Sequence, residues 1–140
     1  MPLQFRVFPV ERMTVILVVD DDLEVRTSLR KLLELNGYQV ITASGGRKAR
    51  EVLDKQAIDI VITDLIMEDM DCLSLIRSLR SLQGAPSVIA ISGGGRGSAT
   101  SYLSAAQKLG ACATFTKPVA VSALLQTLQQ LSSVDHNPIS

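Results

Sequence analysis

Apolar residues along the chain gather in five short runs without alternation, and each run is separated from the next by a segment of helical period. The runs cover residues 15–19, 39–42, 58–63, 88–91 and 113–116. Strands of a parallel sheet read as continuous apolar runs because helices cover the sheet on both faces. The pattern therefore predicts an α/β fold built from five strand–helix units.

The segments between the runs carry apolar residues three and four positions apart, as amphipathic helices do. The first has an apolar face formed by Val25, Leu29, Leu32 and Leu33. Asp22 is placed to cap its start, and Asn36-Gly37 is a typical left-handed stop. Further helices are predicted over residues 46–56, 72–82, 98–109 and 121–131. Right-handed crossovers then give a doubly wound, flavodoxin-like sheet with the expected strand order 2-1-3-4-5.

The strand–helix units occupy residues 13–132, which we interpret as one domain. Residues 1–12 fit no unit, so we expect an N-terminal extension or a start codon placed upstream of the true Met13. Alternatively, Phe5, Val7 and Phe8 add an edge strand or dock on a neighbouring molecule. Residues 133–140 read as a polar tail, and the length of the chain leaves no room for a second full domain. The expectation is a domain that acts alone.

The charge balance limits the classes of partner. The chain has 14 Lys and Arg against 14 Asp and Glu, and it has no basic run. This argues against direct binding of nucleic acid, which needs a positive surface. The longest apolar run, residues 15–19, is far too short to span a membrane, and polar residues interrupt any signal-like segment at the start. We therefore expect a cytoplasmic protein without membrane contact.

The rare residues exclude several kinds of chemistry. Cys72 and Cys112 are too few for a disulfide framework and lack metal-ligand spacing, so we expect both to be reduced and buried. The single histidine, His136, lies in the polar tail. Histidine-based metal sites and histidine-activated nucleophiles are therefore excluded, which leaves carboxylates, hydroxyls and amines as candidate groups.

Polar residues follow the apolar runs at the positions where a parallel sheet presents its carboxyl ends. Ligands bind at this edge in open α/β sheets. The groups placed there are the acids Asp20, Asp21, Asp22 and Asp64, the hydroxyl of Ser92 and the amine of Lys117. These residues follow four different predicted strands, and their side chains complement one another chemically. We therefore interpret them as one site.

Carboxylates held close together repel one another, and a hard cation relieves that repulsion. Mg²⁺ suits such a site because it prefers oxygen ligands and leaves positions open for a phosphoryl oxygen. An aspartate can also act as a nucleophile and form an aspartyl phosphate. Lys117 is then suited to neutralise one phosphoryl oxygen, and Ser92 to donate a hydrogen bond to another.

On these residues the chain resembles a response-regulator receiver domain of two-component signalling, of the CheY-like type. The matching stretches are residues 16–22, 62–67 with 70–71, 90–92, 109–111 and 115–118. The resemblance implies a phosphorylation switch rather than an enzyme, with Asp64 taking a phosphoryl group from a sensor histidine kinase or a histidine phosphotransfer protein. Lys117 and Ser92 would pair with that group, and the bond from Lys117 to Pro118 would be cis.

The same resemblance implies the metal ligands. Asp21, Asp64 and the main-chain carbonyl of Ile66 would bind Mg²⁺ directly, and Asp20 would act through water. Output would pass to a downstream protein, which the sequence does not identify, through the fourth helix, fifth strand and fifth helix. We expect a monomer or a weak dimer.

The chain departs from the family pattern near Asp64 and before Lys117. Glu68-Asp69 stands where Pro-Gly is usual, and Cys72 stands where Gly is common. Thr114 occupies the usual aromatic position, with Phe115 beside it. Glu68, Asp69 and Thr114 motivate one alternative, a pseudo-receiver that binds partners without phosphorylation. We rank it below the phosphorylated switch, because the acids, the hydroxyl and the lysine of the site are all present.

A second alternative is a magnesium-dependent aspartate-nucleophile phosphatase of the haloacid-dehalogenase type. That class needs a second acid two residues after its nucleophile. The pair Asp20 and Asp22 satisfies this spacing, whereas Ile66 stands two residues after Asp64. We rank this alternative below both signalling functions.

Overall fold

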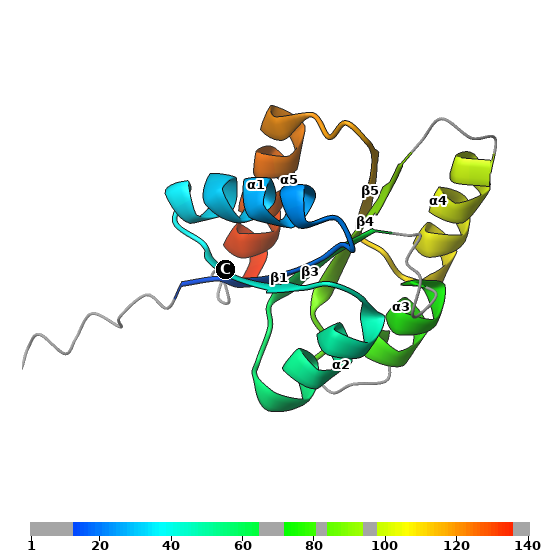
Figure 1. Cartoon of the computed structure of the whole chain (residues 1–140), viewed down its shortest axis with the longest axis horizontal. Helices are drawn as coiled ribbons and strands as arrows, with labels where there is room; N and C mark the ends of the chain where they lie inside the picture. Colours follow the sequence, from blue (N-terminus) through cyan, green and yellow to red (C-terminus); the bar gives the residue numbers. More distant parts are fainter. Residues whose placement is uncertain (1–12, 65–71, 81–83, 94–97, 136–140) are drawn as a thin grey trace, which may run out of the picture.

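The structure is a computed structural model that describes residues 13–64, 72–80, 84–93 and 98–135. Strands and helices alternate along the chain. The elements, shown in Figure 1, are β1 (Val15–Val19), α1 (Leu23–Leu35), β2 (Gln39–Ala43), α2 (Gly46–Lys55), β3 (Ile60–Asp64), α3 (Cys72–Arg80), β4 (Ser87–Ser92), α4 (Ser98–Leu109), β5 (Ala113–Thr116) and α5 (Val121–Asp135). The five predicted strand–helix units are therefore confirmed.

The strands form one parallel sheet in the order β2-β1-β3-β4-β5, as predicted for a doubly wound fold. Figure 1 shows α1 and α5 on one face of the sheet and α2, α3 and α4 on the other. The strand order reverses between β1 and β3, so the helices that follow these two strands lie on opposite faces. In folds of this kind, the carboxyl ends of the two strands at which the order reverses, here β1 and β3, flank the usual place for a ligand.

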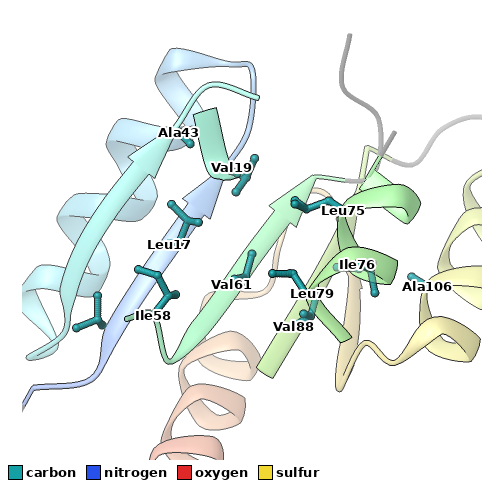
Figure 2. Packing of buried hydrophobic residues seen from close by; sticks show 13 residues of the cluster. Leu17, Val19, Ala43, Ile58, Val61, Leu75, Ile76, Leu79, Val88 and Ala106 are labelled. Atoms are coloured by element: carbon teal, nitrogen blue, oxygen red, sulfur yellow. The ribbon is translucent and has the colours of Figure 1, made fainter. Parts of the chain in front are cut away.

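Two buried clusters, one on each face, explain why the strands read as continuous apolar runs. In β1, Ile16 and Val18 pack toward α1 and α5, whereas Leu17 and Val19 pack toward α2, α3 and α4. Figure 2 shows the cluster on the face covered by α2, α3 and α4, in which Leu75 and other α3 residues pack against the sheet. In the central strands β1 and β3 every residue is thus buried, whichever face it points to.

The ends of α1 follow the predicted signals. The Asp22 side chain accepts a hydrogen bond from the Glu24 N–H at 2.9 Å and so caps the first turn. At the other end, the N–H of Asn36 bonds back to the last turn, and Gly37 adopts a φ of 90°, which a residue with a side chain rarely adopts.

Several predicted boundaries were wrong by one to four residues. The third strand begins at Ile60, because Asp59 lies in a bend before it, where its carboxylate accepts a hydrogen bond from the Val15 N–H at 2.8 Å. Strand β3 includes Asp64 and strand β4 includes Ser92, so both polar residues are the last residues of their strands rather than the first residues after them. Helix α5 continues to Asp135, since residues 132–135 include neither Pro nor Gly.

The prediction for Cys112 was wrong in one respect. Its thiol is free, as expected, but it is exposed rather than buried, because the residue lies in the turn that enters the edge strand β5. The side chain of Cys72 lies outside the described residues. Among the helices that the structure describes, none is long and apolar enough to cross a membrane.

Candidate functional site

The carboxyl ends of β1, β3, β4 and β5 bring the predicted polar residues to one edge of the sheet. Asp20 follows β1 directly, and Asp64 and Ser92 end β3 and β4. Lys117 follows β5, and its backbone N–H donates to the Ser92 carbonyl at 2.8 Å. The peptide bond from Lys117 to Pro118 is cis, as the family pattern implied.

Asp20 is held by hydrogen bonds at all of its polar groups. One carboxylate oxygen accepts from the Asp22 N–H at 2.9 Å, and the other accepts from Lys117 Nζ at 2.9 Å. Its backbone N–H donates to the Ala43 carbonyl at 3.1 Å, and its own carbonyl accepts from Arg26 Nη1 at 2.6 Å. With only 3% of its surface exposed, Asp20 is a buried charge whose partners come from four segments of the chain.

Lys117 joins the ends of the first and third strands. Its ammonium lies 2.9 Å from Asp20 Oδ2 and 3.3 Å from Asp64 Oδ2, and Asp64 is only 7% exposed. Burial lowers the pKa of Lys117, but the hydrogen bond to Asp20 and the charge of Asp64 outweigh that effect and raise the pKa above its usual value. Lys117 is therefore charged at neutral pH.

Three carboxylates of this edge have the composition of a cation site. Oxygens of Asp20, Asp21 and Asp64 lie within 4.8 Å of one another. Lys117 neutralises at most one of the three negative charges, so a divalent cation fits the remainder. An all-oxygen set suits Mg²⁺. Asp21 is the exposed member, and the expected carbonyl ligand of Ile66 lies outside the described residues.

Ser92 and Thr63 supply buried hydroxyls beside the acids. Both are fully buried, and Thr63 Oγ1 donates to the Asp64 carbonyl at 3.0 Å. Ser92 is placed by the pairing of β4 with β5, where it stands opposite Thr116. Thr63 was missed in the sequence, although a polar residue within an otherwise apolar strand was the available signal.

Arg26 was also missed. It lies in the first turns of α1, and its guanidinium reaches back to the carbonyl of Asp20. The only sequence signal was a basic residue close after the acids Asp20 and Asp21. Such a position is common on helix surfaces and does not by itself indicate a contact with the site.

The residues that depart from the family pattern are only partly described. Thr114 stands opposite Ala90 in the sheet and is half-buried. Phe115 packs into the cluster under α1 and α5, the face opposite α4. An aromatic residue is thus present two positions before Lys117, but its side chain lies on the face of the sheet that α1 and α5 cover. Glu68 and Asp69 lie outside the described residues.

A groove of about 570 Å³ lies next to the acids, between α1 and the segment that leads into α5. Its walls are mostly apolar and include Val25 and Leu29 of α1. Lys117 and Gly93 belong to the lining as well. The groove therefore adjoins the residues that follow β4 and β5, and it opens beside the Lys117 side chain.

Comparison with known families and curated proteins gives consistent matches. The sequence profile described as the response regulator receiver domain matches residues 16–129. The transcriptional regulatory protein GlrR of Escherichia coli K12 is 34% identical over 113 residues, which cover 81% of this chain and 25% of that protein. Response regulator MprA of Mycolicibacterium vanbaalenii is 47% identical over 66 residues, 47% of this chain and 29% of that protein. The chain thus spans less than a third of either relative.

Solved structures match over nearly their whole length. A response regulator receiver protein from Pseudomonas putida superposes with a TM-score of 0.78 at 32% identity, covering 86% of this chain and 99% of that chain. The chemotaxis response regulator CheY4 of Vibrio cholerae has a TM-score of 0.74 at 25% identity, with the same coverage.

Proposed function

The chain belongs to the response regulator receiver domain family, and we propose that it works as a phosphorylation-dependent switch whose acceptor is Asp64. Relatives of this family imply a histidine kinase as partner, and we propose that a sensor histidine kinase or a histidine phosphotransfer protein donates the phosphoryl group. The observation that carries the proposal is the bridge from Lys117 to both Asp20 and Asp64 at the open edge of the sheet.

The proposed reaction is a transfer between two side chains. A carboxylate oxygen of Asp64 attacks the phosphorus of the donor phosphohistidine, a P–O bond forms, the P–N bond breaks, and the imidazole leaves as the donor histidine. Lys117 pairs with a phosphoryl oxygen and Ser92 donates a hydrogen bond to another, which stabilises the charge that spreads over these oxygens. The rigid strand ends hold these groups in position, as such a transfer requires.

Asp20, Asp21 and Asp64 would hold Mg²⁺ in this site, with the Ile66 carbonyl as a further ligand. The cation would neutralise charge on the phosphoryl group and the carboxylates. Asp64 is suited to be the acceptor because it ends β3 at the carboxyl edge of the sheet, next to Lys117. Asp20 is less accessible to a donor, since 3% of its surface is exposed against 7% for Asp64.

Signalling would then follow from a shift of population. The phosphoryl group adds charge and acceptor oxygens beside Ser92 and Lys117, and it favours the conformation that bonds it best. The proposed output is protein contact through α4, β5 and α5, within a receiver unit of residues 13–132. The downstream protein is expected to bind the phosphorylated form more tightly than the unphosphorylated one.

The position of Asp22 argues against the phosphatase alternative. This residue is exposed and caps α1, so its carboxylate points to the helix backbone rather than to the neighbouring acids. The pseudo-receiver alternative rests on Glu68, Asp69 and Thr114. It predicts binding of a partner without any gain of a phosphoryl group.

The proposal is tested with phosphoramidate, a small phosphoryl donor, and Mg²⁺, followed by intact-mass measurement. The wild-type protein is expected to gain one phosphoryl group. Asp64→Asn should gain none, whereas Asp54→Asn, which changes an exposed acid of α2, should behave like the wild type. Absence of any gain in the wild type at saturating donor would favour the pseudo-receiver.

A further inference from the structure

Arg26 contacts the acidic site through the backbone rather than through a carboxylate. Its Nη1 atom donates to the main-chain carbonyl of Asp20 at 2.6 Å, a charge-assisted hydrogen bond. The guanidinium comes from α1, whose Arg26 N–H bonds the Asp22 carbonyl at 3.1 Å. One residue thus links the helix to the loop that carries the acids.

The bonded carbonyl belongs to the peptide unit between Asp20 and Asp21. This unit is planar, so a fixed carbonyl also fixes the direction of the next N–H and the position of the next Cα atom. The Ala43 carbonyl accepts from the N–H of Asp20, so the backbone is held on both sides of that residue. The start of Asp21 is therefore oriented by partners outside the acidic cluster.

Asp21 depends on this backbone more than the other two acids do. The side chains of Asp20 and Asp64 bond Lys117, but within the described residues no group donates to the exposed carboxylate of Asp21. Its distance to the other acids is consequently set by its main chain. Residues that orient metal ligands in this way commonly affect metal affinity.

We propose that Arg26 is a positioning residue for Asp21, and that it tightens Mg²⁺ binding by fixing the Asp20–Asp21 peptide. The inference deepens the proposed function and rests on it. A mere effect of charge has the opposite sign: a cation near the site repels Mg²⁺, so its removal would tighten binding. The direction of the change therefore separates positioning from electrostatics.

The test measures the Mg²⁺ dissociation constant by titration calorimetry for the wild type, Arg26→Gln and Arg30→Gln. Arg30 lies one turn further along α1, is exposed and pairs with Glu34 at 3.1 Å, so its variant removes the same charge without touching Asp20. Arg26→Gln is expected to weaken Mg²⁺ binding by about tenfold, the lower end for groups that orient metal ligands. Arg30→Gln should leave it unchanged.

A second readout is the rate of phosphorylation by phosphoramidate as a function of Mg²⁺. Arg26→Gln should need more Mg²⁺ but recover the wild-type rate at saturation, which general destabilisation would not produce. Arg26→Lys keeps the charge with a different donor geometry, and its affinity should fall between those of Arg26→Gln and the wild type. It also serves as the deciding variant if Arg26→Gln does not fold.

Wild-type or tighter Mg²⁺ binding in Arg26→Gln would overturn the positioning role, and so would wild-type binding in Arg26→Lys if only that variant folds. Loss of affinity in Arg30→Gln equal to that in Arg26→Gln would do the same. These outcomes leave the proposed function intact. If the wild type bound no Mg²⁺ and gained no phosphoryl group, both the proposed function and this inference would fail.

Discussion

The ammonium of Lys117 lies 3.3 Å from a carboxylate oxygen of Asp64, although 53 positions separate the two residues in the chain. The contact joins the loop after β5 to the end of β3, across β4. It brings a cation to the acid that we propose as the phosphoryl acceptor. Because Lys117 also bonds Asp20, its removal leaves two buried carboxylates without their shared partner.

Lys117→Met should lower the free energy of unfolding in the absence of Mg²⁺ by about 3 kcal/mol, the order found when one partner of a buried ion pair is removed. Urea denaturation measures this change. Lys108→Met, on the exposed side of α4, should change stability by less than about 0.5 kcal/mol. Equal stability of the two variants would mean that the carboxylates do not need Lys117.

The same bridge predicts a dependence on pH at the alkaline end. Asp20 and Asp64 raise the pKa of Lys117 in the folded state, so the stabilisation is complete below the unfolded value, about 10.4, and is lost as pH rises through the folded pKa. The difference in unfolding free energy between the wild type and Lys117→Met should therefore shrink above about pH 10.4. A difference that stays constant to pH 12 would contradict this.

The variant Asp21→Asn separates the effect of Mg²⁺ binding on stability from the stability of the metal-free fold. Because Asp21→Asn removes one of three close carboxylates and so relieves their repulsion, the variant should be at least as stable as the wild type without Mg²⁺. With Mg²⁺ at ten times the wild-type dissociation constant, the wild type should gain about 1.4 kcal/mol and the variant much less. Thermal melts with and without Mg²⁺ measure this, with Asp54→Asn as the control. An equal gain in all three proteins would exclude Asp21 as a ligand.

Much of the architecture could be predicted because local patterns and tertiary packing agree. Strands buried on both faces need continuous apolar runs, and Asp22 with Gly37 marks the ends of α1. The polar residues at the carboxyl edge of the sheet were found because they directly follow these apolar runs. Their placement at one edge follows from the parallel sheet alone.

The contacts that were missed depend on side-chain directions that a sequence pattern does not encode. Arg26 reads as a surface residue of a helix, and only the fold brings its guanidinium to the Asp20 carbonyl. Ile58 reads as part of a strand and is buried, yet the backbone bends at Asp59, whose side chain bonds the Val15 N–H, so the strand begins later. Cys112 was misplaced because the preference of cysteine for burial does not hold at an edge turn.

Asp22→Ala distinguishes a helix cap from a catalytic acid. Loss of the cap should lower stability by about 1 kcal/mol. Because the Asp22 N–H still bonds Asp20, Asp64 should still gain a phosphoryl group from phosphoramidate. Chemical denaturation and intact mass check the two parts. Loss of all phosphoryl transfer in a folded Asp22→Ala variant would favour the phosphatase alternative.

The most direct measurement of the central claim locates the acyl phosphate. Borohydride reduces a phosphorylated aspartate to homoserine, and peptide mass spectrometry identifies the position. After treatment with phosphoramidate and Mg²⁺, we predict homoserine at position 64, and none at position 20 or 21. Homoserine at Asp20, or no homoserine at any position in protein that has been exposed to saturating donor, would contradict the assignment of Asp64 as the acceptor.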